Sequence, residues 1–69
     1  MSFAQVVVDY VATRDGELSA SKGDFVQVLA STGSMCHVCR QTNDQSGIIE
    51  GLLPNHVLTM KDITDNGFR

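Results

Sequence analysis

The sequence has no tryptophan, only one proline and one tyrosine, and no long uninterrupted run of apolar residues. Without an apolar stretch of about 20 residues, no segment is expected to cross a membrane as a helix. Residues 1–4 also lack the charged and apolar regions of a secretory signal. Two cysteines are too few for a disulfide framework. We therefore expect a cytoplasmic protein whose thiols stay reduced.

Basic residues are few and scattered. Five Lys and Arg residues stand against eight Asp and Glu residues, which gives a formal net charge of -3. Proteins that bind phosphate-rich partners normally gather their basic residues into a patch or stripe. Nucleic acids and membrane surfaces are therefore not expected as partners, whereas a basic peptide would suit the charge of this chain.

The 69 residues can form one small domain. Clusters of Gly, Asp, Asn and Ser separate short stretches rich in Val, Leu and Ile, and no stretch has the apolar periodicity of an amphipathic helix. This pattern predicts an all-β domain with strands at residues 4–10, 25–30, 35–41 and 48–53. The domain is expected to cover residues 4–61, followed by a polar tail or linker at residues 62–69.

The pair Cys36 and Cys39 could indicate a zinc site, with His56 as a distant ligand. Residues three apart on a strand point to opposite faces, so these two thiols are expected to diverge. The sequence instead predicts that Cys36 is a small buried group and that Cys39 is half exposed. His37 shares a face with Cys39, but no obvious carboxylate orients it for nucleophilic catalysis. We therefore expect no metal site and no enzyme activity.

Four short motifs follow one another along the chain. They are Val8-Asp9-Tyr10, Glu17-Leu18-Ser19, Lys22-Gly23-Asp24 and Gly51-Leu52-Leu53-Pro54-Asn55-His56-Val57. In this order and at these separations the chain resembles a Src homology 3 (SH3) domain, in which the corresponding motifs typically read A-L-Y-D-Y, L-S-F-x-x-G-D and G-Y-x-P-x-N-Y-V. The resemblance implies a small five-stranded SH3-like barrel, built from two packed orthogonal sheets.

A closer resemblance lies where SH3 domains usually carry two adjacent tryptophans. This chain has Met35-Cys36 there, followed by a long polar loop and the ending Glu50-Gly51-Leu52-Leu53-Pro54. These features are similar to the SH3 domains of the kalirin and triple-functional-domain family, which are large Rho guanine nucleotide exchange factors. The resemblance implies a regulatory or scaffolding module without catalytic residues or cofactors, because a separate Dbl-homology domain performs the exchange in that family.

The SH3 resemblance also implies a groove for an extended polyproline peptide, lined by aromatic side chains. The matching positions hold Val8, Tyr10, Asp15, Glu17, Met35, Leu52, Pro54 and His56. The aromatic residue common in the family is replaced at Val8, Met35, Leu52 and His56. Because a lost tryptophan anchor costs ~2 kcal/mol or more, we expect proline-rich peptides to bind weakly or not at all.

Several alternatives stay open at this point. The apolar strip either binds a partner or only covers the core, and Asp15 and Glu17 either hold a basic residue or form a solvated turn. His56 either makes binding sensitive to pH or is an ordinary exposed histidine. The domain, expected to be a monomer, is an intermolecular peptide binder, an intramolecular clamp on another domain, or a structural spacer.

The family fold and the alternation along the strands predict the same barrel interior. It consists of Ala4, Val6, Leu18, Ala20, Val26, Val28, Val38, Leu53 and Val57. Gly23 is expected to adopt a positive φ in the turn that precedes the second strand, a conformation that glycine adopts at little cost.

Overall fold

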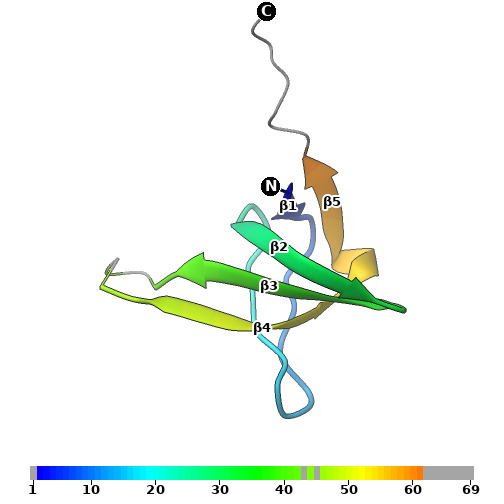
Figure 1. Ribbon diagram of the computed structural model, residues 1–69, viewed down its shortest axis with the longest axis horizontal. Helices are drawn as coiled ribbons and strands as arrows, with labels where there is room; N and C mark the ends of the chain where they lie inside the picture. The colour runs from blue at the N-terminus through cyan, green and yellow to red at the C-terminus, as the bar shows by residue number, and fades with distance from the viewer. Residues whose placement is uncertain (1, 43, 45, 62–69) are drawn as a thin grey trace, which may run out of the picture.

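The described part of the chain contains five strands and one short 3₁₀ helix (Figure 1). The computed structural model describes residues 2–42, 44 and 46–61. The elements are β1 (Ser2–Val6), β2 (Phe25–Thr32), β3 (Met35–Gln41), β4 (Ile48–Pro54), the 3₁₀ helix η1 (Asn55–Val57) and β5 (Leu58–Lys61). The predicted all-β class and the number of strands are confirmed; the predicted tail at residues 62–69 lies outside the described residues.

The strands form one continuous antiparallel sheet in the order β4-β3-β2-β1-β5. The SH3 resemblance predicted two packed sheets, whereas backbone hydrogen bonds join all five strands into a single sheet. The sheet twists strongly, so that β5 runs at a steep angle to β3 and β4 (Figure 1). The crossing of its two ends encloses a core between them, as two orthogonal sheets would.

The first strand begins earlier and ends sooner than predicted. The sequence predicted a strand at residues 4–10, but β1 covers Ser2–Val6. The backbone N–H of Gly23 donates to the carbonyl of Val6 at 2.7 Å, and Gly23 has a φ of 97°, as predicted for this turn. Beyond this contact the chain leaves the sheet, and Tyr10 forms an isolated bridge with Ala20.

A tight hairpin connects β2 to β3. Thr32 and Met35 are paired, so the turn between them has only two residues, the first of which is Gly33 with a φ of 58°. Further along β2, the register shifts between Val28 and Ala30, which leaves Leu29 as an extra, exposed residue. The simple alternation expected for this strand therefore breaks at Leu29.

The core lies inside the curved sheet and is entirely apolar. Its buried residues are Ala4, Val6, Ala20, Val26, Cys36, Val38, Leu53 and Val57. Leu18 and Val28, which the sequence predicted to be buried, are only partly buried and pack against this core. Val28 precedes the register shift in β2, and Leu18 lies on a loop whose outer side faces solvent.

Within the part of the chain that the structure describes, no helix has the length and apolar character needed to cross a membrane.

Val38 gives a direct test of the core. Its side chain is fully buried, so Val38→Ala should lower the free energy of unfolding by about 2 kcal/mol, measured by urea denaturation. The matched substitution Val11→Ala, at a side chain that is 74% exposed, should change stability by no more than about 0.5 kcal/mol. Equal losses in the two variants would contradict the position of the core.

Candidate peptide-binding groove

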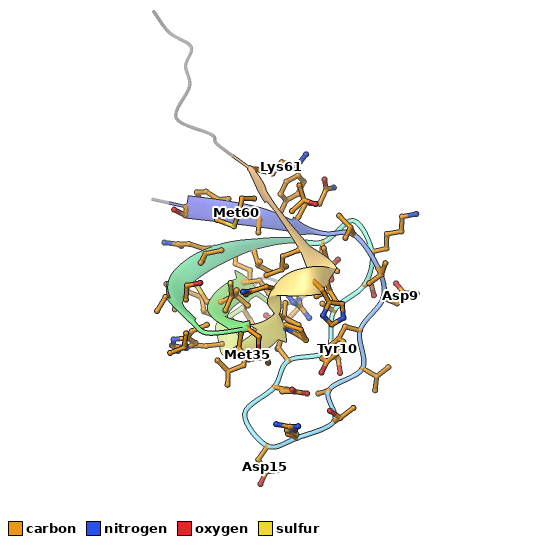
Figure 2. The ribbon with its side chains drawn as sticks, turned by 90° about the vertical axis from the view of Figure 1, so that its right-hand side faces the viewer. Asp9, Tyr10, Asp15, Met35, Met60 and Lys61 are labelled. Atoms are coloured by element: carbon orange, nitrogen blue, oxygen red, sulfur yellow. The ribbon has the colours of Figure 1, made fainter. Side chains whose placement is uncertain are left out.

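One wall of the predicted groove is a long loop, residues 11–19, which we call the RT loop. Its two ends are joined by the backbone of Tyr10 and Ala20, which exchange hydrogen bonds of 2.8 and 2.9 Å. The hydroxyl of Ser19 then accepts a hydrogen bond of 2.9 Å from the backbone N–H of Ala12. The loop is therefore a closed hairpin, and it projects from the barrel with Asp15 at its tip (Figure 2).

The RT loop is also attached to β4. The backbone N–H of Leu18 donates to the carbonyl of Leu52 at 3.0 Å, and the N–H of Leu52 donates to the carbonyl of Gly16 at 2.9 Å. This close approach depends on Gly51. A Cβ at that position would lie 3.0 Å from Cβ of Leu18 and 3.1 Å from the carbonyl oxygen of Gly16. The absence of a side chain at Gly51 thus lets the loop pack directly on β4.

Glu17 links the two arms of the RT loop through its carboxylate. Atom Oε1 accepts hydrogen bonds from the hydroxyl of Tyr10 at 2.8 Å, and from the backbone N–H and the hydroxyl of Thr13 at 2.8 and 3.2 Å. The Thr13 backbone N–H first, and then the Tyr10 hydroxyl, hold the pKa of Glu17 below its ordinary value. One oxygen of the carboxylate is therefore already used within the domain.

The other predicted wall lies where β3 begins and β4 ends. Met35 is paired with Pro54 across the two strands; Pro54 is buried and Met35 is half-buried. The next residue, Asn55, fixes the turn between β2 and β3, because its Nδ2 atom donates to the carbonyl of Gly33 at 3.1 Å. Its Oδ1 atom accepts a hydrogen bond of 3.0 Å from the thiol of Cys36.

The structure brings several of the predicted groove residues close together through these contacts. Tyr10 is joined to Glu17, Glu17 is bridged to Leu52, and Met35 is paired with Pro54 two residues further along β4. Val8 is 47% exposed, and His56 is exposed on η1. Asp15 lies apart from these residues at the loop tip (Figure 2).

Three interactions of the structure were not predicted from the sequence. The sequence predicted no role for Asn55, it predicted a solvated or ligand-binding Glu17 rather than one bonded within the loop, and it indicated no carboxylate near His37. In the structure Nε2 of His37 lies 2.9 Å from Oε1 of Glu50 on the neighbouring strand. Alternation along β3 could not reveal this pair, because it depends on the register between β3 and β4.

The two thiols diverge as predicted. Cys36 is buried and bonded to Asn55, whereas Cys39 is half-buried and lies 4.0 Å from Oε1 of Gln27. His37 is engaged by Glu50 rather than by Cys39. Among residues 2–42, 44 and 46–61, no group of three His, Cys, Asp or Glu side chains is arranged to hold a metal ion.

A five-stranded barrel with a long loop packed on its fourth strand and a 3₁₀ turn before the fifth is the architecture of an SH3 domain. The family is also clear: residues 1–61 match the sequence model described as "Kalirin, SH3", so the chain belongs to the kalirin SH3 family. SH3 domains are non-catalytic modules that bind proteins and peptides. The resemblance noted in the sequence is therefore confirmed.

Solved structures agree with this assignment. The C-terminal SH3 domain of myosin IB from Entamoeba histolytica is 25% identical to this chain, with a TM-score of 0.70, over 87% of this chain and 92% of that one. A second structure of that domain, bound to the EhFP10(GEF) peptide, is 22% identical with a TM-score of 0.73. It covers 99% of this chain and 94% of the other.

Substituting Gly51 should loosen the RT loop. In Gly51→Ala the new methyl group would meet the backbone of Gly16 and Leu18, so we expect a loss of roughly 1–3 kcal/mol in unfolding free energy. Faster hydrogen exchange at the amides of Leu18 and Leu52 should accompany this loss. Gly47→Ala is the control, because a Cβ there meets nothing within 4 Å. Unchanged exchange at both amides in Gly51→Ala would contradict the close approach.

The Glu17 carboxylate predicts a pH dependence. Its pKa is lowered in the folded domain, so its stabilising effect is present above its ordinary pKa of 4.5 and disappears as the pH falls through the folded value. The difference in unfolding free energy between wild type and Glu17→Gln should therefore shrink as the pH falls below 4.5. Urea titrations at several pH values measure this difference. The corresponding difference for Asp44→Asn should persist to lower pH, since hydrogen bonds from Ser46 and Thr42 lower the pKa of Asp44 to about 2. A pH-independent Glu17→Gln difference would contradict this.

Proposed function

We propose that this domain is a cytoplasmic protein-recognition module that regulates or scaffolds a Rho guanine nucleotide exchange factor, and that it binds partners through an atypical groove with few aromatic residues. Membership of the kalirin SH3 family supports the link to exchange factors. The related myosin SH3 domain was solved with the EhFP10(GEF) peptide bound, which supports peptide binding by this fold. We further propose that it acts as a monomer and that neither nucleic acid nor membrane is its partner.

The replacement of a groove tryptophan by Met35 is the observation on which the atypical groove depends. Met35 is half-buried beside the buried Pro54, so an apolar side chain still covers this position. Methionine is flexible and packs well against irregular apolar shapes, but it has no flat wall for a proline ring and no N–H donor. We therefore propose that proline-rich peptides bind weakly and that the preferred partner makes different contacts.

A second mode, in which the groove docks on a neighbouring domain of the same protein, has support from the same surface. Val8 is 47% exposed, and Tyr10, Met35 and Leu52 are partly exposed. An apolar strip of this kind suits a partner that is always present at high local concentration, because covalent linkage compensates for weak affinity. In this mode the domain acts as an autoinhibitory clamp on exchange.

Combined substitution of Met35→Asp and Tyr10→Ala in the parent exchange factor should separate the two modes. Loss of two apolar anchors of ~2 kcal/mol each should nearly abolish contact through the strip. Faster nucleotide exchange would support the clamp, and lost recruitment of a partner would support the intermolecular binder. Ile48→Asp is the control, since Ile48 is 68% exposed at the opposite end of β3 and β4.

Two outcomes would contradict the proposal. If the double variant changes neither exchange nor partner recruitment, the domain is a spacer whose groove binds nothing. If the unmodified domain binds ordinary proline-rich peptides with Kd values of about 1 μM rather than near 1 mM, the groove is a conventional one despite Met35.

A further inference from the structure

The side chains of the predicted groove offer very few hydrogen-bond donors. Its residues are Val8, Tyr10, Asp15, Glu17, Met35, Leu52, Pro54 and His56. Apolar side chains donate nothing, and ionised carboxylates only accept. Only Tyr10 and His56 therefore carry an O–H or N–H group that could donate to a ligand.

The donor of Tyr10 is already committed. Its hydroxyl donates at 2.8 Å to Oε1 of Glu17, whose carboxylate accepts further hydrogen bonds from the backbone N–H and the hydroxyl of Thr13. A hydroxyl has one proton, so a ligand carbonyl that approaches Tyr10 meets only oxygen lone pairs. The contact that closes the RT loop thus withdraws a donor from the groove.

The amide of Asn55, an exposed residue beside Pro54, is partly committed to contacts within the domain. Its Nδ2 atom donates to the carbonyl of Gly33 at 3.1 Å, while its Oδ1 atom accepts from the thiol of Cys36 at 3.0 Å. These two contacts fix the orientation of the side chain and use one of the two N–H groups of Nδ2, so a single amide N–H of Asn55 stays available. Of the predicted groove side chains, His56 alone keeps a donor for a ligand.

The small number of available hydrogen-bond donors disfavours a polyproline ligand. A polyproline helix has no internal hydrogen bonds, so its carbonyl groups need donors from the surface that covers them. Burying a carbonyl without a partner costs about 1–3 kcal/mol. The His56 ring and one N–H of Asn55 cannot satisfy several carbonyls along the strip, so binding a peptide of this kind costs free energy of desolvation.

Addition of a peptide strand beside the groove is blocked for a different reason. An added strand needs an open sheet edge with unpaired backbone groups. At Leu52, on the edge strand β4, both the N–H and the carbonyl are already bonded to the RT loop, at 2.9 and 3.0 Å. The loop therefore occupies the edge that borders Tyr10 and Glu17.

We propose that the groove binds an amphipathic α-helix through a stripe of aliphatic side chains. This inference rests on the proposed function and specifies the conformation of the partner. A helix satisfies its own backbone carbonyls and presents apolar side chains at i, i+3, i+4 and i+7, so it needs almost no donors from the groove. Met35 and Leu52 offer it an adaptable apolar surface.

Charge adds one further feature to this partner. The groove side chains offer acceptors in excess: the exposed carboxylate of Asp15, the second oxygen of Glu17 and the lone pairs of the Tyr10 hydroxyl. The whole chain has a net charge of -3. The helix should therefore carry Lys or Arg beside its aliphatic stripe, where these residues can donate to the acidic RT loop.

The test compares designed peptides on the 69-residue domain, by NMR chemical-shift mapping and calorimetric titration. The first probe is a panel of helices of about 14 residues with a leucine stripe and flanking lysines. The second has the same sequences with a central Ala→Pro substitution, which breaks the helix without changing its charge. The third is a panel of proline-rich peptides with flanking arginines.

The helical panel should shift resonances of Val8, Tyr10, Met35 and Leu52, and its best member should bind about tenfold tighter than the best proline-containing peptide of either kind. Met35→Asp should weaken this binding about tenfold, and Ile48→Asp should leave it unchanged.

Met35→Trp adds a reciprocal test, because it restores an indole wall and an N–H donor. This variant should bind proline-rich peptides more tightly and the helices less tightly than the native domain does. If proline-rich peptides bind the native groove best, the helix proposal is wrong while the proposed recognition function stands. If no helical peptide shifts the groove, the helix proposal is also wrong, and the exchange and recruitment assays on the parent decide the proposed function separately.

Discussion

Two backbone hydrogen bonds between the RT loop and Leu52 organise the recognition side of this domain. They tie the RT loop to the fourth strand, and they form because Gly51 has no side chain to hold the two backbones apart. The positions of Tyr10 and Glu17 follow from this attachment, since both lie on the hairpin that it fixes. The attachment of the loop is thus a product of main-chain packing.

The Glu17 carboxylate shows how one contact serves stability and limits recognition together. Its three hydrogen bonds close the RT loop across residues 10–17. The same contacts leave the Tyr10 hydroxyl without a proton for a ligand. In the groove that we propose, a second donor would thus be missing beside the indole that Met35 replaces, and for a separate, internal reason.

The sequence predicted the fold well because local signals agreed with one another. Gly23 marks the turn before β2, and alternation along β3 placed Cys36 and Val38 in the core and Cys39 on the other face. Features that depend on contacts between distant segments were missed. Strand register determines the extra residue at Leu29 and the pairing of His37 with Glu50, and turn geometry determines the contacts of Asn55. Periodicity along the sequence encodes neither.

The hydrogen bond from the Tyr10 hydroxyl to Glu17 has a consequence for selectivity among the many interaction modules of a cell. Proline-rich segments are shared targets, and modules with abundant donors compete for them. If the groove binds as proposed, it offers mostly acceptors and would compete poorly for these segments, so abundant off-target sequences would rarely occupy it. Binding selectivity would then depend on a hydrogen bond within the RT loop that makes no contact with the ligand. The outer shape of the loop would matter less than this internal contact.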